Sequence, residues 1–161
     1  GVAIIHQELN MCKDLTVAQN MFLGREERKG FVLNNSNMED IARKYLGELG
    51  VDISPDEIVG ELPVSKQQMI EIAKALSINA KILIMDEPTR GIDVGAKYEI
   101  YELIINMAKQ GKTVIVVSSE MPEILGITNR IGVMSNGRLS GIVNTKETNQ
   151  EELLRLSAKY L

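Results

Sequence analysis

The sequence of 161 residues contains no tryptophan, two phenylalanines, four tyrosines, one cysteine and one histidine. So few aromatic side chains argue against a surface on which nucleic-acid bases stack. The single Cys12 forms no internal disulfide, which is typical of a reducing compartment. Because His6 is the only histidine, and we expect it to be exposed or locally hydrogen-bonded, the sequence predicts neither a histidine-rich metal site nor a Ser-His-Asp triad.

The sequence also lacks an excess of positive charge and any long apolar run. Its formal net charge is −4, whereas binding to nucleic acid requires a basic face. The longest apolar stretches, such as "ILIM" and "VIVV", have the length of strands and not of membrane spans. We therefore expect a cytoplasmic protein that does not bind nucleic acid. Because the chain begins with Gly1 inside the apolar run "GVAII", we also expect it to be a fragment.

Hydrophobic patterning predicts an α/β protein with a mostly parallel sheet. Strands are predicted over 2–5, 81–86 and 113–119, the last two with the continuous apolar character of strands buried on both faces. Helices are predicted over 16–23, 36–49, 65–76, 94–110 and 120–127, and at the C-terminus after Thr148. Residues 24–35 and 50–63 are predicted to be loops, and 130–143 a hairpin with its turn at Asn136-Gly137.

The ends of these helices are predicted from local signals. Capping boxes are predicted at Ser36, Ser65 and Thr148. Asp93 is expected to cap the helix after it, and Gly111 to end that helix.

A pair of carboxylates, Asp86 and Glu87, follows the predicted strand 81–86 in the segment "LIMDEPTRGID". Parallel sheets place ligands at the carboxyl ends of their strands, and buried charge is costly without a partner. Asp86 could hold Mg²⁺ through water, and Glu87 could orient or deprotonate an attacking water. The alternative is that Asp-Glu simply begins a loop.

Four segments resemble the motifs of ABC transporter ATPases. "LIMDEPTRGID" resembles the Walker B segment and D-loop, and "IIHQELN" resembles the Q-loop. "ELPVSKQQMIEIAKAL" is similar to the signature and its helix, and "VIVVSSEMPEI" to the segment of the switch histidine. The resemblance covers essentially all 161 residues, and it is strongest to the tandem ATPases of ribose/galactoside-type sugar importers.

The resemblance implies a partial P-loop NTPase (ABC ATPase) fold of class α/β, with a mostly parallel sheet flanked by helices. It implies one incomplete domain over 1–161, with a helical subdomain at about 14–76 between the Q-loop and the signature. The Walker B core and the C-terminal part would then occupy about 77–161.

The resemblance also assigns roles to residues. Glu87 and Gln7 would be catalytic, and Asp86 and Gln7 would hold the metal. The residues that would contact the nucleotide are Gln7, Ser65, Lys66, Gln67, Asp93 and Ser119. ATP and Mg²⁺ are the implied cofactors. The implied partners are transmembrane permease subunits and a second ATPase domain or a second copy, at the inner face of the cell membrane.

One element of such a site, the phosphate-binding loop G-x-x-x-x-G-K-[ST], is not found in the sequence. The only GKT, at 111–113, follows a predicted helix and opens a predicted strand, which is the reverse order, and Asn106 stands where the first glycine belongs. In the signature segment, Pro63, Val64 and Ser65 replace Ser-Gly-Gly, and Ser119 replaces the switch histidine. We therefore expect weak ATP binding or none.

Two interpretations remain open from the sequence. The chain could belong to an ATP-hydrolysing importer subunit, or it could be a non-catalytic remnant that serves as an interaction or dimerisation module with an uncovered apolar sheet face. Its front resembles the first tandem domain and its back the second. We therefore expect an internally deleted hybrid with a seam near 85–89. A source locus that encodes a single ordinary domain would contradict this hypothesis.

Overall fold

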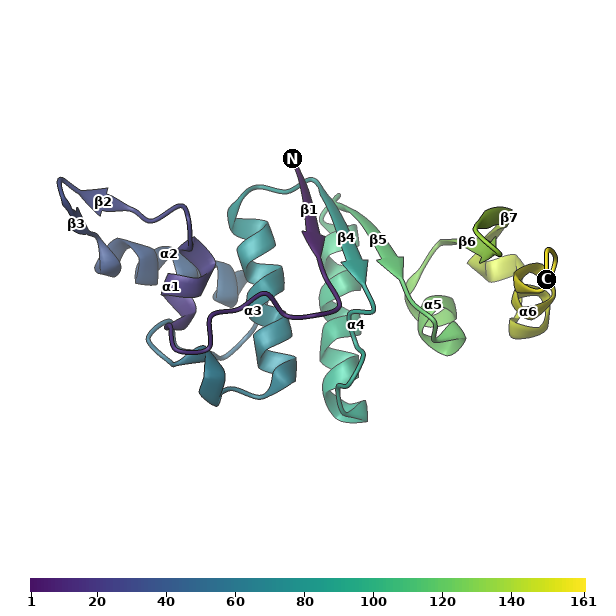
Figure 1. Ribbon diagram of the computed structural model, residues 1–161, viewed down its shortest axis with the longest axis horizontal. Coiled ribbons are helices and arrows are strands. Elements are labelled where there is room, and N and C mark those ends of the chain that lie inside the picture. The colour runs from purple at the N-terminus through teal and green to yellow at the C-terminus, as the bar shows by residue number, and fades with distance from the viewer. The chain divides into compact units, whose positions relative to one another are not determined.

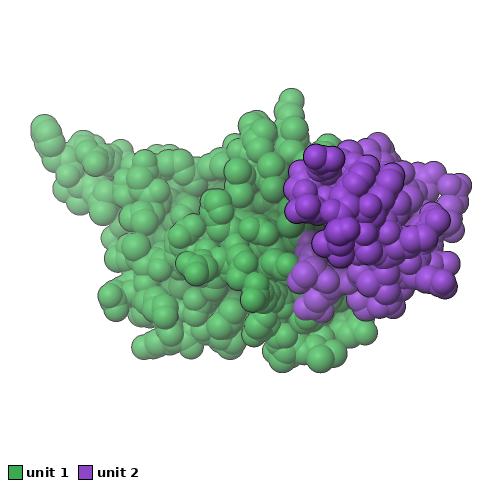
Figure 2. Space-filling view, turned by 45° about the vertical axis from the view of Figure 1, so that its right-hand side comes forward, with its two compact units in different colours: residues 1–117 green, residues 118–161 purple.

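The structure is a computed structural model that describes residues 1–161 in two units, residues 1–117 and 118–161 (Figure 2). The first unit contains a three-stranded sheet, a small hairpin and four α-helices. The second unit contains a hairpin and two α-helices. None of the helices is long and apolar enough to cross a lipid bilayer.

The main sheet is parallel and consists of β1 (Val2–Ile5), β4 (Ile82–Asp86) and β5 (Thr113–Val117) in the order β1-β4-β5 (Figure 1). The three apolar runs that predicted these strands carry β-branched residues, which suit a pleated surface. In the register, Ile5 lies opposite Met85, and Asp86 lies opposite Val117. The central strand β4 therefore brings the end of β1 and the end of β5 to the same edge of the sheet.

The prediction that 81–86 and 113–119 are buried on both faces is wrong. Side chains alternate between the faces of a strand, and the buried set includes Ile5, Leu83 and Met85. This face is covered by α3 (Val64–Ser77), which packs against β1, and by α4 (Val94–Lys109), which packs against β5. The opposite face exposes about half of the side-chain surface of Ile4 and Ile115.

A second core lies among α1 (Val17–Phe22), α2 (Asn35–Glu48) and α3, next to the 3₁₀ turn η1 (Val59–Glu61). A capping box begins α1, in which Thr16 and Gln19 each accept the other's backbone N–H. The buried residues of this core are Val17, Ala18, Met21, Phe22, Met38, Ala42, Leu46, Ile53, Val59, Leu62, Ile70 and Ala73.

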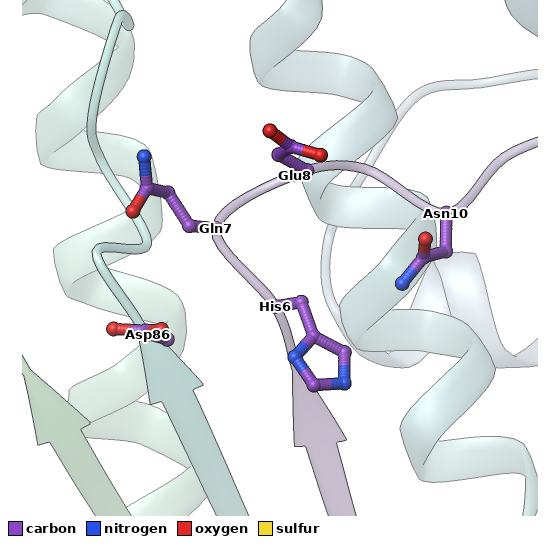
Figure 3. A pocket seen from close by; sticks show the side chains of 5 residues that line it. All are labelled: His6, Gln7, Glu8, Asn10 and Asp86. Atoms are coloured by element: carbon purple, nitrogen blue, oxygen red, sulfur yellow. The ribbon is translucent and has the colours of Figure 1, made fainter.

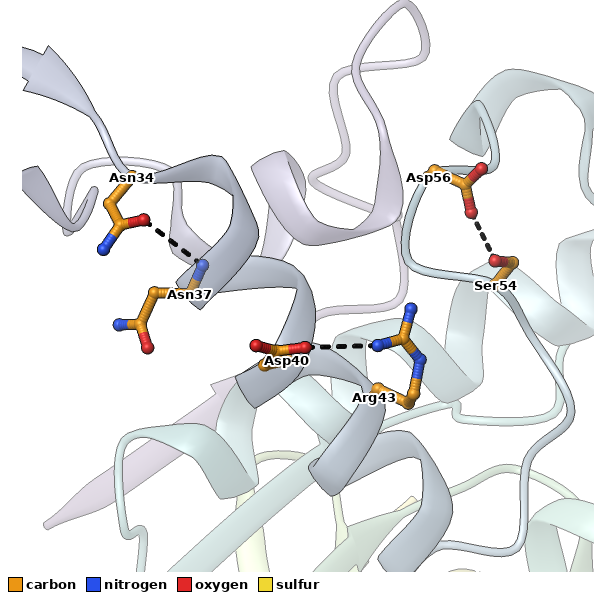
Figure 4. Close-up of polar contacts among 6 residues, drawn as sticks. All are labelled: Asn34, Asn37, Asp40, Arg43, Ser54 and Asp56. Carbon is orange, nitrogen blue, oxygen red and sulfur yellow. Dashed lines mark hydrogen bonds and ion pairs between the residues drawn. The ribbon is translucent and has the colours of Figure 1, made fainter.

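The capping boxes predicted at Ser36 and Ser65 are wrong. Helix α2 begins earlier, because the side-chain oxygen of Asn34 accepts the backbone N–H of Asn37 at 3.4 Å (Figure 4). Asparagine caps a helix as well as serine does, so the pattern alone does not choose between neighbouring positions. Helix α3 has Pro63 as its N-cap and no side-chain cap. Ser65 therefore lies within its first turn.

Two exposed polar contacts near α2 are also visible in Figure 4. Arg43 and Asp40 form an ion pair at 3.3 Å on the outer face of α2. The Ser54 hydroxyl donates to the Asp56 carboxylate, and this hydrogen bond lowers the pKa of Asp56 from 3.8. Exposed contacts of this kind contribute little to stability.

Helix α4 has the ends that the sequence predicts. The Asp93 carboxylate accepts the backbone N–H of Ala96 at 3.0 Å and so caps its first turn. The helix ends at Lys109, and Gly111 adopts a φ of 87°, a left-handed conformation that glycine reaches without steric cost.

Residues 24–35, predicted as a loop, contain a short antiparallel hairpin. Strand β2 (Arg28–Lys29) pairs with β3 (Val32–Leu33). Lys29 lies opposite Val32, with Gly30 at a φ of 69° in the turn. Strands of two residues fall below the length at which alternating hydrophobicity can be detected, so the pattern missed them.

The second unit contains α5 (Met121–Ile127), β6 (Arg130–Ser135), β7 (Arg138–Asn144), the 3₁₀ turn η2 (Thr145–Glu147) and α6 (Gln150–Ser157). The predicted β6–β7 hairpin is confirmed, since Asn136 and Gly137 have φ values of 44° and 74°. The capping box predicted at Thr148 is wrong by one residue, because Asn149 caps α6 by accepting from Glu152.

Candidate functional site

The parallel register places Gln7 and Asp86 at one edge of the sheet. Because Ile5 pairs with Met85, the chain leaves β1 beside Asp86, the last residue of β4. An open hollow of about 430 Å³ lies there, lined by His6, Gln7, Glu8, Asn10 and Asp86. Figure 3 shows the Gln7 side chain extending from the loop after β1 toward the β4 side, where Asp86 lies. The structure therefore brings together the two residues that were predicted to hold the metal.

Glu87, the predicted catalytic carboxylate, has a left-handed backbone. Its φ is 47°, and its backbone N–H donates to the carbonyl oxygen of Val117 on β5 at 2.8 Å. The turn continues with the N–H of Arg90 donating to the Glu87 carbonyl at 3.1 Å. Such a conformation is uncommon for a residue with a β-carbon, and such strain clusters at functional sites. No sequence pattern predicted it.

The predicted signature residues lie apart from this hollow, in the first turn of α3. The Lys66 ammonium donates to the carbonyl of Asp52 at 3.2 Å, and the buried Gln67 amide donates to the carbonyl of Leu62 at 2.8 Å. Ser65 is half-buried beside them. These side-chain contacts hold the start of α3 against the preceding loop.

The remaining two predicted residues are exposed. Asp93 lies beyond the turn that follows Glu87, where its carboxylate caps α4. Ser119 belongs to the second unit and precedes α5.

The oxygen donors at the hollow suit a magnesium ion. Mg²⁺ prefers hard oxygen ligands, retains several water molecules and commonly takes only one or two carboxylates from the protein, with substrate phosphates as further ligands. Asp86 supplies the carboxylate and Gln7 the amide oxygen, and the hollow is open to water. The residues present therefore fit the metal.

The same hollow has acidic side chains in its lining. It is lined by the carboxyl groups of Glu8 and Asp86, and no lysine or arginine lines it. Lys112 of the GKT segment donates to the carbonyl of Ala80 at 3.3 Å, beside Thr113, which pairs with the first residue of β4. This segment therefore lies at the edge of the sheet opposite to Asp86, and it lies between a helix and a strand as the sequence predicted.

Glu71 is a polar residue that the sequence analysis missed. It lies on α3, and its Oε1 atom is buried with no hydrogen-bond partner. Burial raises the pKa of Glu71 above 4.5, against the opposing charges of Lys74 and His6. In the sequence Glu71 stands between Ile70 and Ile72, both of which are fully buried in the structure. These apolar neighbours are the one sequence signal that could have indicated a buried acid.

The parallel sheet thus places Asp86, Glu87 and Gln7 at the same edge. Solved structures have the same fold. The cbiO1 protein from Clostridium perfringens, part of an ABC transporter complex, superposes with a TM-score of 0.77 at 25% identity, covering 95% of this chain and 61% of that one. A putative metal-chelate type ABC transporter superposes with a TM-score of 0.81 at 20% identity. Its matched region covers 96% of this chain and 62% of the other.

Residues 1–90 match the family model described as ABC transporter, and the chain belongs to this family. It is 58% identical over 131 residues to the galactose/methyl galactoside import ATP-binding protein MglA of Treponema pallidum, which covers 81% of this chain and 26% of MglA. It is 45% identical over 158 residues to the ribose import ATP-binding protein RbsA of Geobacillus kaustophilus, covering 97% of this chain and 32% of RbsA. The chain thus spans between a quarter and a third of these two relatives.

Proposed function

We propose that the chain is part of the ATP-binding component of a sugar-importing ABC transporter. Within that component it supplies the half of the ATP site that handles metal and water. The names of the galactoside and ribose import relatives support the sugar class. The observation that carries the proposal is the convergence of Gln7 and Asp86 on one hollow, beside the strained Glu87.

Each predicted site residue takes a role in this proposal. Asp86 and Gln7 would hold Mg²⁺, which would neutralise charge on the phosphates. Glu87 accepts a hydrogen bond from the attacking water and orients it, and its fixed backbone limits the positions that its carboxylate can reach. Gln7 also senses whether the terminal phosphate is present.

The other predicted residues act at the borders of the site. Ser65, Lys66 and Gln67 lie at the start of α3, where backbone N–H groups and the helix dipole attract an anion. Asp93 orders the turn after Glu87, and Ser119 occupies the position of the switch histidine.

We infer that the chain by itself binds ATP weakly. A triphosphate requires lysine and a nest of backbone N–H groups, and the hollow beside Asp86 offers two carboxyl groups instead. The nucleotide would then be bound tightly only when the chain is assembled with other subunits or domains. The expected partners are transmembrane permease subunits and a second ATPase domain or a second copy, at the inner face of the cell membrane.

The metal role can be tested with Mn²⁺ as a paramagnetic substitute for Mg²⁺. In the ¹⁵N-labelled chain, Mn²⁺ should broaden the amide signals of Gln7 and Glu87 first, and excess Mg²⁺ should reverse the effect. Asp86→Asn should abolish this broadening, whereas the matched variant Asp52→Asn, at an exposed loop position, should retain it. Broadening that is unchanged in Asp86→Asn would contradict the proposed site.

The exposed sheet face supports a second candidate function, that of an interaction or dimerisation module. Val2, Ile4 and Ile115 each expose about half of their side chains on this face. Large apolar patches of this kind seek partners. This function is non-catalytic, and it would persist in a variant that lacks Asp86 and Glu87.

A further inference from the structure

The β2–β3 hairpin presents an apolar tip that no other part of its unit covers. Phe31, directly after the turn glycine, is fully exposed, and Val32 and Leu33 expose 70% and 46% of their surface. Figure 1 shows the hairpin projecting away from α1 and α2, to which it is connected. Single exposed apolar residues are ordinary on a protein surface, but three in succession usually serve binding.

The register gives each face of the hairpin one cation and one aliphatic side chain. Residues directly opposite each other in an antiparallel pair share a face. Lys29 lies opposite Val32, and Arg28 lies opposite Leu33. The two faces are therefore chemically alike, with Phe31 between them at the tip.

The acidic residues of this segment lie at the base of the hairpin. No Asp or Glu occurs from Arg28 through Met38. Glu26 turns back to accept the backbone N–H of Gly24 at 2.9 Å, and this hydrogen bond lowers the pKa of Glu26 from 4.5. The carbonyl of Glu27 accepts the N–H of Asn34 at 2.8 Å, which closes the ladder below the tip. The tip is thus locally cationic in a chain whose net charge is −4.

A protein groove would favour apolar groups on one face, whereas this tip carries them on both faces and at its end. A lipid surface surrounds an inserted tip with the same apolar environment on all sides, and it therefore suits that arrangement. The cations fit negatively charged headgroups, because long Lys and Arg side chains extend toward headgroups while the apolar atoms near them enter the interface. We propose that the β2–β3 hairpin inserts Phe31 into an anionic lipid surface, with Arg28 and Lys29 at the lipid phosphates.

This proposal does not depend on the proposed ATP-site chemistry, and the absence of tryptophan from the chain provides a site-specific test. The Phe31→Trp variant carries its only tryptophan at the tip. With vesicles of phosphatidylglycerol, its emission should shift to the blue, and lipids brominated near the headgroup should quench it. With vesicles of phosphatidylcholine, the spectrum should not change.

The matched control is Tyr98→Trp, which places the only tryptophan on the outer side of α4, where Tyr98 is 65% exposed. Its emission should not respond to either kind of vesicle. Replacing Arg28 and Lys29 by glutamine in the Phe31→Trp background should raise the half-saturating lipid concentration about 25-fold, since each cation near an anionic membrane contributes about a fivefold change.

Three results would overturn the proposal. The first is no blue shift of the Phe31→Trp variant with phosphatidylglycerol, which is also the result expected if the tip docks in an acidic groove of a protein. The second is an equal shift in the Tyr98→Trp control, which would indicate general adsorption through other apolar surface. The third is binding that does not change when the two cations are removed.

Discussion

The backbone N–H of Glu87 donates a hydrogen bond to the carbonyl oxygen of Val117, with 2.8 Å between the nitrogen and the oxygen. This bond extends the parallel β4–β5 ladder by one residue beyond Asp86, while the φ of Glu87 turns to 47°. The strand thus ends in a bend that is fixed from β5. The β4–β5 ladder therefore fixes the backbone of Glu87, the proposed catalytic residue, and also positions Asp86.

The first prediction concerns this bend. Glu87→Gly should be more stable than Glu87→Val by about 1–2 kcal/mol, because glycine adopts positive φ freely and a β-branched residue does not. Both variants lack the carboxylate, so their difference isolates the backbone. Unfolding in urea, followed by circular dichroism, measures it. At the exposed helical residue Glu99, the order should reverse, and the same order at both positions would contradict the account.

The second prediction concerns the pH dependence that Glu71 causes. Its pKa is raised in the folded chain by burial, so the folded state binds more protons than the unfolded state as the pH rises from 4.5. The free energy of unfolding should therefore fall as the pH rises from 4.5 through the raised pKa. Glu71→Gln should remove that fall and stabilise the chain at pH 7 by roughly 1 kcal/mol.

Urea unfolding at a series of pH values tests this. Glu102→Gln, at an exposed position on α4, serves as the control and should retain the fall. A Glu71→Gln variant with the same pH profile as the parent chain would show that the carboxyl is not the cause.

The third prediction concerns Asn20, a fully buried residue of α1 that holds the loop after the proposed metal site. Its amide accepts the N–H of Cys12 at 2.8 Å and donates to the carbonyls of Cys12, Leu15 and Thr16. Asn20→Ala should lower the free energy of unfolding by at least about 2 kcal/mol, because buried backbone groups lose their partners. Asn106→Ala, at an exposed position in α4, should leave stability within about 0.5 kcal/mol.

The fourth prediction concerns the uncovered sheet face. If it mediates self-association, the double variant Ile4→Thr, Ile115→Thr should shift the chain toward monomer, because it removes apolar area while retaining β-propensity. Light scattering over a range of concentrations measures the effect. The control is Tyr98→Thr, which removes an exposed side chain of α4. A monodisperse monomer in the parent chain would contradict the prediction of dimerisation.

The sequence predicted those parts of the structure that depend on local patterns. The three apolar runs became β1, β4 and β5, and Asp93, Gly111 and the Asn136-Gly137 turn act as their residue types imply. The caps at Ser36 and Thr148 were wrong because Asn34 caps a helix as well as serine does, and Asn149 caps one better than threonine does. Local patterns fail where a nearby residue is equally or better suited.

Other features depend on the tertiary arrangement, which local patterns do not contain. The continuous apolar character of β4 predicted that both faces of this strand are buried. Only one face of the sheet is covered, because α3 and α4 pack on the same side of it. The left-handed Glu87 follows from its bond to Val117, a residue far away in the sequence on the neighbouring strand. The site roles, the proposed domain bounds and the seam near 85–89 stay predictions.

In the proposed function, Asp86 and Gln7 serve the metal and the water, while the chain by itself binds the triphosphate weakly. The most direct measurement is a titration of the purified chain with a fluorescent ATP analogue in the presence of Mg²⁺. The account predicts a signal that does not saturate at millimolar nucleotide. Saturable binding at micromolar nucleotide that Asp86→Asn abolishes would contradict it.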